Sequence, residues 1–357
     1  MHIVMTTIPI SLGEVYDRIS ILNIKKERIT DPMKLDHVTR EIETLPQVEE
    51  KYEELFNQLL DINKSLWNVE DSLREFETRK KFDDEFIFYA RSVYKLNDKR
   101  FELKNEINKI SEMKIAEQKH HPLKIKKQNI IIFPHLGIGD FLCCLSAIRI
   151  YAEQFKVYLI IKAEYEDKIK FFLRDITDLE YILVHNDRYQ DLTFDQGIPV
   201  KAIGQHRTGQ PVRIRDFPGV FYSDFNLPKE AMHDKFQYIR DMFEENQVYD
   251  KIYKEHPEYV VIHDDPTRGL LVDERQLPEG IHRVYLGRDH KMIPMIYSKK
   301  LLEHAKEIHC IDSSFMWFVG MNRIETKKIL HSRARKNSKD DPIVYFGIAE
   351  GKSWTVI

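Results

Sequence analysis

A glycine-containing turn in the middle of the chain holds the first residues that could do chemistry. It reads Pro134-His-Leu-Gly-Ile-Gly-Asp140, between a run of β-branched residues and apolar residues at helical spacing. Gly137 and Gly139 allow close approach of the backbone to a ligand, and the start of the following helix offers unpaired N–H groups. Asp140 is either part of a ligand site at this junction or only a helix N-cap, a common role of Asp. His135 is either a ligand contact or a structural histidine.

The same turn does not match the common nucleotide-binding fingerprints. Gly137-Ile-Gly139 lacks the third glycine of a dinucleotide-binding motif, and no stretch of the chain matches a phosphate-binding P-loop. An NAD-dependent enzyme and a kinase are therefore disfavoured.

A second group of polar side chains follows predicted strands in the last third of the chain. A hydroxyl pair at a helix N-terminus, with a guanidinium nearby, suits a diphosphate. Asp312-Ser-Ser314 is also an ordinary capping sequence, and both interpretations stay open. The candidate ligand-binding residues of this group are Thr267, Arg268, Arg288, Lys291, Asp312, Ser313 and Ser314.

Three weaker candidates remain. The turn-rich stretch 186–228 holds His206 and Arg207, and it is either a loop facing an acceptor or a surface loop without a role. Asp264-Asp265 could bind a divalent cation or cap a turn, and the turn is favoured, so we expect no metal cofactor. The basic run 331–336 either helps to hold phosphate or is solvated surface.

Predicted strands position these residues, and the strands alternate with predicted helices along the chain. This alternation indicates parallel sheets that are covered by helices on both faces. One such series runs over residues 128–256 and a second over 257–357, so we expect two Rossmann-like domains. Ligands of open α/β sheets bind at the carboxyl ends of the strands, where the polar clusters lie.

Residues 1–118 predict an all-α region instead. Ser11-Leu-Gly-Glu14 is a capping box, and two heptad series, Val48 to Leu73 and Phe86 to Ile110, flank a polar turn near residues 78–84. This predicts a helical bundle or coiled-coil hairpin, joined to the sheets by a basic linker at 119–127. Its charged faces are either solvated surface or an arm for dimerisation or partner docking.

The composition limits the choice of function. The 357 residues carry a formal net charge of −3, which lacks the basic excess that nucleic-acid binding requires. The three cysteines, Cys143, Cys144 and Cys310, lie in apolar runs and predict reduced thiols. No signal peptide or membrane-spanning stretch is recognisable, so a soluble cytoplasmic protein is expected.

Two motifs together resemble a known family. Pro134-His-Leu-Gly-Ile-Gly-Asp140-Phe-Leu and Ile308-His-Cys-Ile-Asp312-Ser-Ser-Phe-Met-Trp317 resemble the two-part signature of heptosyltransferase-like glycosyltransferases, family 9 and its relatives. Ser314 stands where that family usually has glycine. The segment 11–25 is similar to an uncharacterised helical module associated with bacterial glycan loci.

This resemblance implies the GT-B arrangement, with a nucleotide sugar on the second Rossmann-like domain and a glycan or glycolipid acceptor on the first. Asp140 would be the general base of a metal-independent inverting displacement, with His135 as an acceptor ligand or alternative base. Arg268, Ser313 and Ser314, then Thr267, would stabilise the departing diphosphate. Gly137, Gly139, His206 and Arg207 would face the acceptor. A homodimer through the helical region and peripheral membrane contact stay open.

Two other functions compete with this prediction. One is a non-catalytic assembly or sensor protein that uses the helical hairpin to bind a partner. The other is an epimerase or hydrolase on the same architecture, although no NAD fingerprint supports an epimerase.

Overall fold

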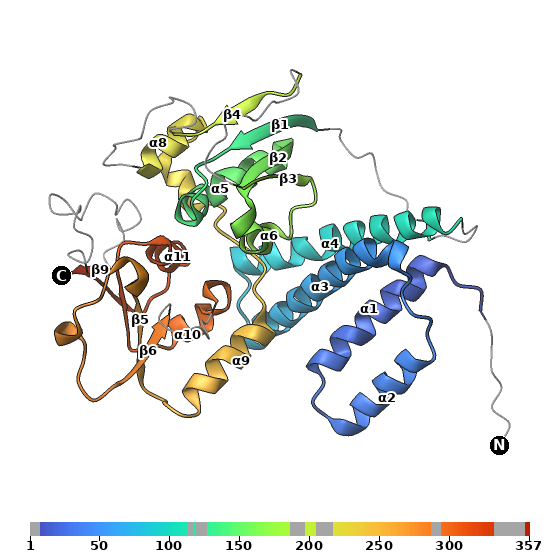
Figure 1. Ribbon diagram of the computed structural model, residues 1–357, viewed down its shortest axis with the longest axis horizontal. Coiled ribbons are helices and arrows are strands. Elements are labelled where there is room, and N and C mark those ends of the chain that lie inside the picture. The colour runs from blue at the N-terminus through green and yellow to red at the C-terminus, as the bar shows by residue number, and fades with distance from the viewer. Residues whose placement is uncertain are drawn as a thin grey trace. The chain divides into compact units, whose positions relative to one another are not determined.

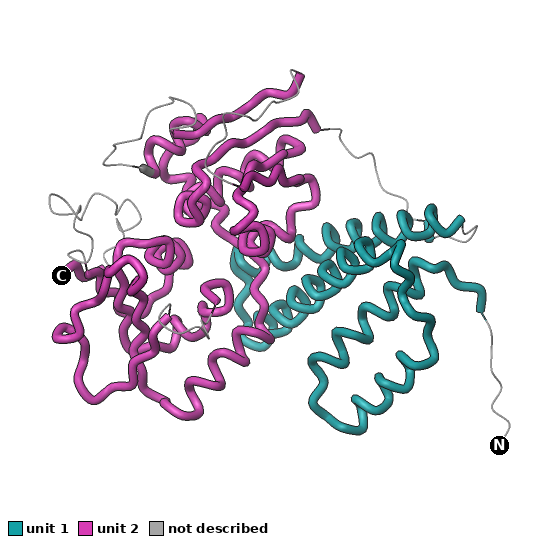
Figure 2. Tube along the Cα trace, in the orientation of Figure 1, with its two compact units in different colours: residues 1–125 teal, residues 126–357 magenta. Residues whose placement is uncertain are grey.

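The computed structural model describes residues 8–112, 117–118, 127–185, 197–204, 217–286, 294–331 and 354–357. The chain divides into two compact units, residues 1–125 and 126–357 (Figures 1 and 2). The expected fold class, a helical region followed by two Rossmann-like α/β sheets, is confirmed.

The first unit is helical. Ser11 caps its first helix, with Oγ accepting the N–H of Glu14 at 3.3 Å, as the capping box predicts. Most of the two heptad series lies in two long antiparallel helices, although the first series begins at Val48, before its helix starts at Glu53. Lys80 ends the first of these helices in a left-handed conformation. Tyr16, Leu59 and Ile107 lie in the apolar core between the helices. The helices are α1 (Leu12–Arg28), α2 (Pro32–Glu43), α3 (Glu53–Arg79) and α4 (Asp84–Ile110), with a short 3-10 turn, η1 (Glu50–Tyr52).

The second unit begins with a parallel four-stranded sheet of order β3-β2-β1-β4. Its β-branched and aromatic strand residues pair in register from Gln128 with Phe155 onward. The strands are β1 (Gln128–Phe133), β2 (Phe155–Lys162), β3 (Leu179–Val184) and β4 (Val200–Ala202). The helical segments are α5 (Ile138–Gln154), η2 (Ala163–Tyr165), α6 (Glu166–Leu173), α8 (Phe217–Asp224) and η4 (Lys229–His233).

A second parallel sheet follows, with strand order β6-β5-β7-β8-β9. Its strands are β5 (Tyr259–His263), β6 (His282–Leu286), β7 (Glu307–Cys310), β8 (Lys327–Leu330) and β9 (Trp354–Val356). The helical segments are α9 (Met242–Tyr253), η5 (Pro266–Arg268), η6 (Glu274–Gln276), η7 (Met295–Tyr297), α10 (Lys299–Glu303) and α11 (Ser314–Met321).

One apolar cluster extends through both halves of this unit. It joins Ile132 and Leu159 of the first sheet, helices α5 and α11, and Val261 and Ile308 of the second sheet. The opposite faces of the two sheets carry two smaller clusters, which consist of strand and loop residues in the described part of the chain. Helix α5 thus lies in a core shared by both sheets.

Two segments differ from the sequence-based expectation. The stretch 186–228, expected to be a loop, contains strand β4 and helix α8. The sequence pattern of residues 229–245 predicts a helix, but the structure has the 3-10 turn η4 there, then a segment without regular secondary structure, and α9 begins only at Met242. Asp241 determines that start, because its carboxylate accepts the N–H of Glu244 at 3.2 Å.

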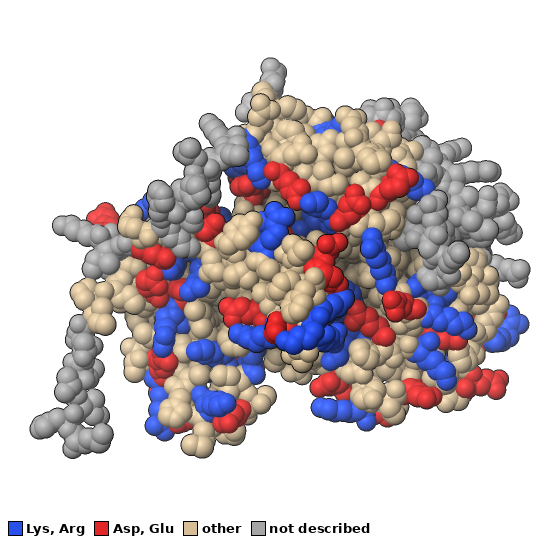
Figure 3. All heavy atoms as spheres, turned by 180° about the vertical axis from the view of Figure 1, so that it is seen from behind, with Lys and Arg blue, Asp and Glu red and all other residues tan. Residues whose placement is uncertain are grey.

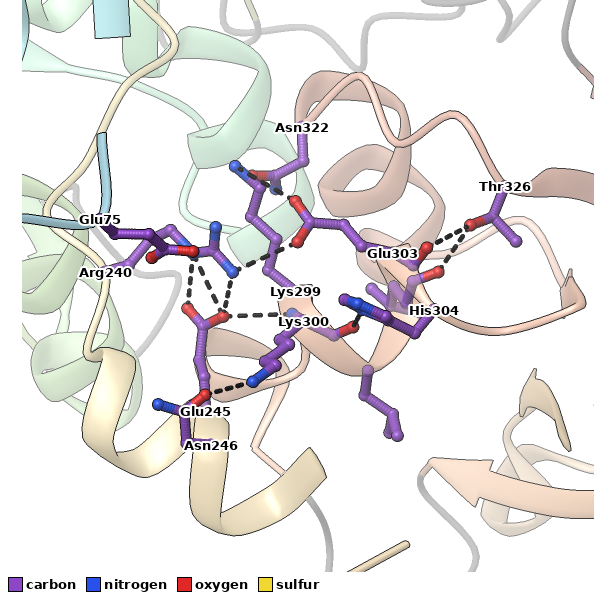
Figure 4. Close-up of polar contacts among 12 residues, drawn as sticks. Glu75, Arg240, Glu245, Asn246, Lys299, Lys300, Glu303, His304, Asn322 and Thr326 are labelled. Carbon is purple, nitrogen blue, oxygen red and sulfur yellow. Dashed lines mark hydrogen bonds and ion pairs between the residues drawn. The ribbon is translucent and has the colours of Figure 1, made fainter. Parts of the chain in front are cut away.

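Polar contacts connect α9 to α10 (Figure 4). The buried carboxylate of Glu245 pairs with the guanidinium of Arg240 and accepts the N–H of Lys300 at 3.1 Å. Lys300 Nζ also donates to Asn246 Oδ1 at 2.5 Å. Helix α9 is therefore held against the helix that precedes β7.

The described surface carries both signs of charge. On the face shown in Figure 3, Lys and Arg side chains alternate with Asp and Glu side chains. Among the described helices, none combines the length and apolar character needed to cross a membrane.

Candidate functional site

The candidate residues lie where the strand order of each sheet changes direction. In the first sheet, β2 and β4 lie on opposite sides of β1, and in the second sheet, β6 and β7 lie on opposite sides of β5. Connections that leave such a switch point in opposite directions open a crevice at the carboxyl ends of the strands, where ligands bind. His135 follows β1, and Asp264 follows β5.

Asp140 lies in the first turn of α5. The helix begins at Ile138 with Gly137 as its N-cap, so Asp140 does not cap it. Its side chain is 37% exposed, and its Oδ2 lies 3.7 Å from Nδ1 of His135. A Cβ placed on Gly137 would lie 2.9 Å from the same oxygen. The turn therefore presents a partly exposed carboxylate beside an imidazole, with glycine leaving room for it.

His135 is buried between helix α8 and the segment that follows β4. Its ring meets the ring of Phe221 edge-on, with centroids 4.7 Å apart. Its Nε2 points at Gly204, which directly follows the short strand β4 and Ile203. The imidazole is held on both sides, so its Nδ1 edge stays near Asp140.

At the second switch point, Ser313 is the N-cap of α11, but its side chain makes no capping hydrogen bond. Its Oγ donates to the carbonyl of Ile311 at 3.3 Å and lies 3.5 Å from Nδ1 of His263. The His263 ring stacks on Phe315, with centroids 4.5 Å apart and planes within 5°. Burial lowers the pKa of His263 to about 4, against the raising effect of the nearby Asp264. His263 is therefore a neutral hydrogen-bonding group near pH 7.

The two switch points meet at the starts of α5 and α11. A Cβ placed on Gly139 would lie 3.3 Å from Cα of Ser314 and 3.5 Å from Cδ1 of Trp317. Neither helix start has a side-chain cap. Because uncapped helix N-termini carry partial positive charge and free N–H groups, this contact joins two anion-attracting ends beside Asp140.

Thr267 and Arg268 lie in the exposed turn η5, where Asp265 engages both. Asp265 accepts the hydroxyl of Thr267 at 2.6 Å and also the backbone N–H and guanidinium of Arg268. The bond from Thr267, followed by those from Arg268, lowers the pKa of the Asp265 carboxyl despite partial burial. None of their hydrogen bonds in the described chain reaches Ser313 or Ser314.

Asp312 lies half-buried in the connection between β7 and the N-cap Ser313. Four other predicted site residues, Arg288, Lys291, His206 and Arg207, lie outside the described residues.

Sequence reasoning missed three residues of this region: Gly204, Asp224 and His263. Gly204 follows a strand of three residues, too short to leave a periodic signal. The pattern Glu258-Tyr-Val-Val-Ile-His263 predicts a strand, and His263 is only its last residue in that prediction. A search for polar residues at every strand end would have found it.

The described residues contain no group of three or more His, Cys, Asp or Glu side chains placed to hold a metal ion. Asp265, one of the two carboxylates considered for a cation, instead organises the turn that contains Thr267.

Comparisons with known proteins give matches of two kinds. The model of a family of unknown function (DUF6165) matches residues 6–130. No curated protein matches the chain in sequence.

Two solved structures show some similarity. One is the iron-containing dodecameric glycosyltransferase TibC from enterotoxigenic E. coli H10407, with TM-score 0.35 and 14% identity, over 60% of this chain and 62% of TibC. The other is the fucosyltransferase NodZ from Bradyrhizobium, with TM-score 0.28 and 14% identity, over 54% of this chain and 93% of NodZ. The chain thus spans less than two thirds of TibC. The family match covers the helical unit and stops within β1, so the candidate site lies outside it.

Proposed function

We propose that the chain transfers a sugar from a nucleotide-sugar donor to a hydroxyl of a glycan or glycolipid acceptor. The contact between Gly139 and Ser314 carries this proposal. It brings a partly exposed carboxylate next to the uncapped start of α11. Glycosyl transfer needs both groups together: a base for the acceptor hydroxyl and positive potential for the departing diphosphate.

In the proposed reaction, Asp140 takes the proton of the acceptor hydroxyl. The oxygen then forms a bond to the anomeric carbon, while the bond from that carbon to the diphosphate oxygen breaks. The nucleoside diphosphate leaves with the electron pair. Nδ1 of His135 lies 3.7 Å from Oδ2 of Asp140, so His135 is the second candidate for the proton acceptor. Because the His135 side chain is buried, we assign it the role of supporting Asp140 rather than of accepting the proton itself.

We assign the diphosphate to the start of α11, with the hydroxyls of Ser313 and Ser314. Thr267 and Arg268 are weaker donor contacts than the sequence suggested, because Asp265 engages both side chains. Arg288 and Lys291 for the donor, and His206 and Arg207 for the acceptor, stay predictions. The scheme requires no metal ion, since N–H groups and hydroxyls supply the stabilisation.

A thermal-shift screen of the full chain against nucleotide sugars, with and without EDTA, tests donor binding. We expect one donor to raise the melting temperature by several degrees, because a ligand that binds only the folded state stabilises it. EDTA should leave this shift unchanged. No shift for any donor at millimolar concentration would overturn the proposal and favour the assembly-protein alternative.

Asp140→Asn then separates a transferase from a sensor. We expect this variant to keep the donor-induced shift and to lose roughly two to four orders of magnitude in turnover. Asp167→Asn is the matched control, because Asp167 is an exposed carboxylate in the first turn of α6. Full turnover in Asp140→Asn would remove Asp140 from the role of base.

A further inference from the structure

Gly204 lies in a position that only glycine can occupy. Its φ is +57°, a backbone conformation that L side chains rarely adopt. A Cβ there would lie 2.3 Å from Nε2 of His135 and 3.0 Å from Cε1 of Phe221. Any side chain at position 204 would therefore displace the imidazole.

Asp224 holds Gly204 in this position. Its Oδ2 accepts the N–H of Gly204 at 2.7 Å. Asp224 is the last residue of α8, and the same helix supplies Phe221, which contacts the His135 ring. Helix α8 thus positions the His135 ring in two ways: directly through Phe221, and indirectly through Asp224, which holds Gly204 against the ring.

The position of Asp224 in its helix argues for a specific role. A carboxylate at a helix C-terminus faces the negative end of the helix dipole, which is unfavourable. The charge-assisted hydrogen bond to Gly204 offsets this cost. Helix termination alone would not call for a carboxylate at this residue.

We propose that Gly204 and Asp224 are positioning residues that hold His135 against Asp140. This inference rests on the proposed function, in which Asp140 is the base. Gly204 lies against Nε2 of His135, and the opposite edge of the ring turns Nδ1 toward Asp140 Oδ2. Gly204 and Asp224 act through His135 and contact no substrate in this scheme.

NMR of the imidazole rings tests the positioning in the full chain, with ¹³C,¹⁵N-labelled histidine and a His135→Gln variant for assignment. In the parent protein, Asp140→Asn should shift the His135 Nδ1 resonance. In Gly204→Ala and in Asp224→Ala, that response to Asp140→Asn should be lost. Asp224→Asn should keep it, because the amide oxygen accepts the same hydrogen bond.

The chain offers matched controls. Gly280→Ala introduces the same kind of backbone strain, at φ +71°, where a Cβ meets no atom within 4 Å. Gly197→Ala changes a glycine of the segment before β4, also in open space. Both should leave the His135 resonances in place. An unchanged response to Asp140→Asn in a folded Gly204→Ala or Asp224→Ala protein would overturn the inference.

Kinetics give the second readout. We expect Asp224→Ala to lower kcat roughly ten- to a hundredfold, the cost of a small misplacement in an active site, with the KM for donor unchanged. Asp224→Asn should restore most of kcat. If the parent protein transfers no sugar, the proposed function fails while the NMR measurement still decides the positioning. A normal kcat in Asp224→Ala would count against the inference.

Discussion

His309 and His331 lie side by side at the ends of β7 and β8, and both rings are buried. Nε2 of His309 lies 3.1 Å from a carboxylate oxygen of Glu307, so that nitrogen carries the proton. Burial lowers the pKa of both imidazoles, so both rings are neutral near pH 7. In a neutral ring Nδ1 of His309 must accept, and Nε2 of His331 donates to it at 3.1 Å. Nδ1 of His331 is left as a buried acceptor without a hydrogen-bond partner among the described residues.

The buried pair of His309 and His331 predicts that the free energy of unfolding depends on pH. Burial, with the neighbouring His309, lowers the pKa of His331 from 6.5 to about 4, while Asp273 raises it in part. The unfolded chain then binds more protons than the folded chain between these values. The free energy of unfolding therefore has its full value above about pH 6.5. It falls by up to about 3 kcal/mol as the pH falls toward 4.

Urea unfolding at pH 7.5 and pH 5 would measure this loss. In a Trp67→Phe background, the remaining tryptophans, Trp317 and Trp354, both report on unit 2. His331→Gln should reduce the pH dependence, and His185→Gln, at an exposed histidine, should preserve it. Equal pH dependence in His331→Gln and the parent protein would show that the pair does not titrate as the geometry requires.

At the candidate site, the sequence predicted the positions of residues but not their neighbours. The placement of Asp140 and Ser313 at the starts of helices could be predicted because each follows a recognisable strand. The contact of Gly139 with Ser314 could not, since it depends on how two sheets pack across a shared core. The role of Gly204 was also hidden, because the residues that it contacts are distant in sequence.

Among the elements, α1 is connected to its neighbours by close and polar contacts. The buried carboxylate of Asp17 accepts from Arg100 of α4 at 2.8 Å and from Asn63 of α3 at 2.8 Å. The N–H of Gly13 donates to Asn108 Oδ1 at 2.7 Å. A Cβ on Gly13 would lie 2.5 Å from the carbonyl oxygen of Lys104. The backbones of α1 and α4 therefore approach too closely for a side chain.

Gly13→Ala tests this close approach, because two effects predict opposite signs. Helix propensity alone favours alanine by about 1 kcal/mol. The clash with the backbone of α4 should destabilise the helical unit by roughly 1–3 kcal/mol. Hydrogen exchange of peptides from α1 in the full chain would decide, and we expect faster exchange in the variant. Slower exchange would mean that α1 does not pack on α4 at Gly13.

Element lengths explain which parts of the fold could be predicted. Helices α3 and α4 contain 27 residues each, long enough for the periodicity of their apolar residues to be unmistakable. Strands β4 and β9 have three residues each, and β8 has four, so their patterns merge with those of loops. Pairing with neighbouring strands, rather than local sequence, determines their structure.

At the scale of the whole molecule, each compact unit has an apolar cluster of its own among its described residues. The cluster around Tyr16 and Leu59 belongs to residues 1–125. The three clusters of the sheets belong to residues 126–357. A segment with its own core satisfies the main condition for independent folding.

We therefore predict that residues 126–357 fold and bind the donor without the helical unit. The fragment should unfold cooperatively and show the same donor-induced shift in melting temperature as the full chain, since both switch points lie within it. Residues 1–125 alone should give a helical circular dichroism spectrum and no donor-induced shift. Such a result would assign chemistry to the sheets and leave the helical unit available for a partner or a second copy. A folded 126–357 fragment that lost donor binding would instead require the helical unit to contribute to the site.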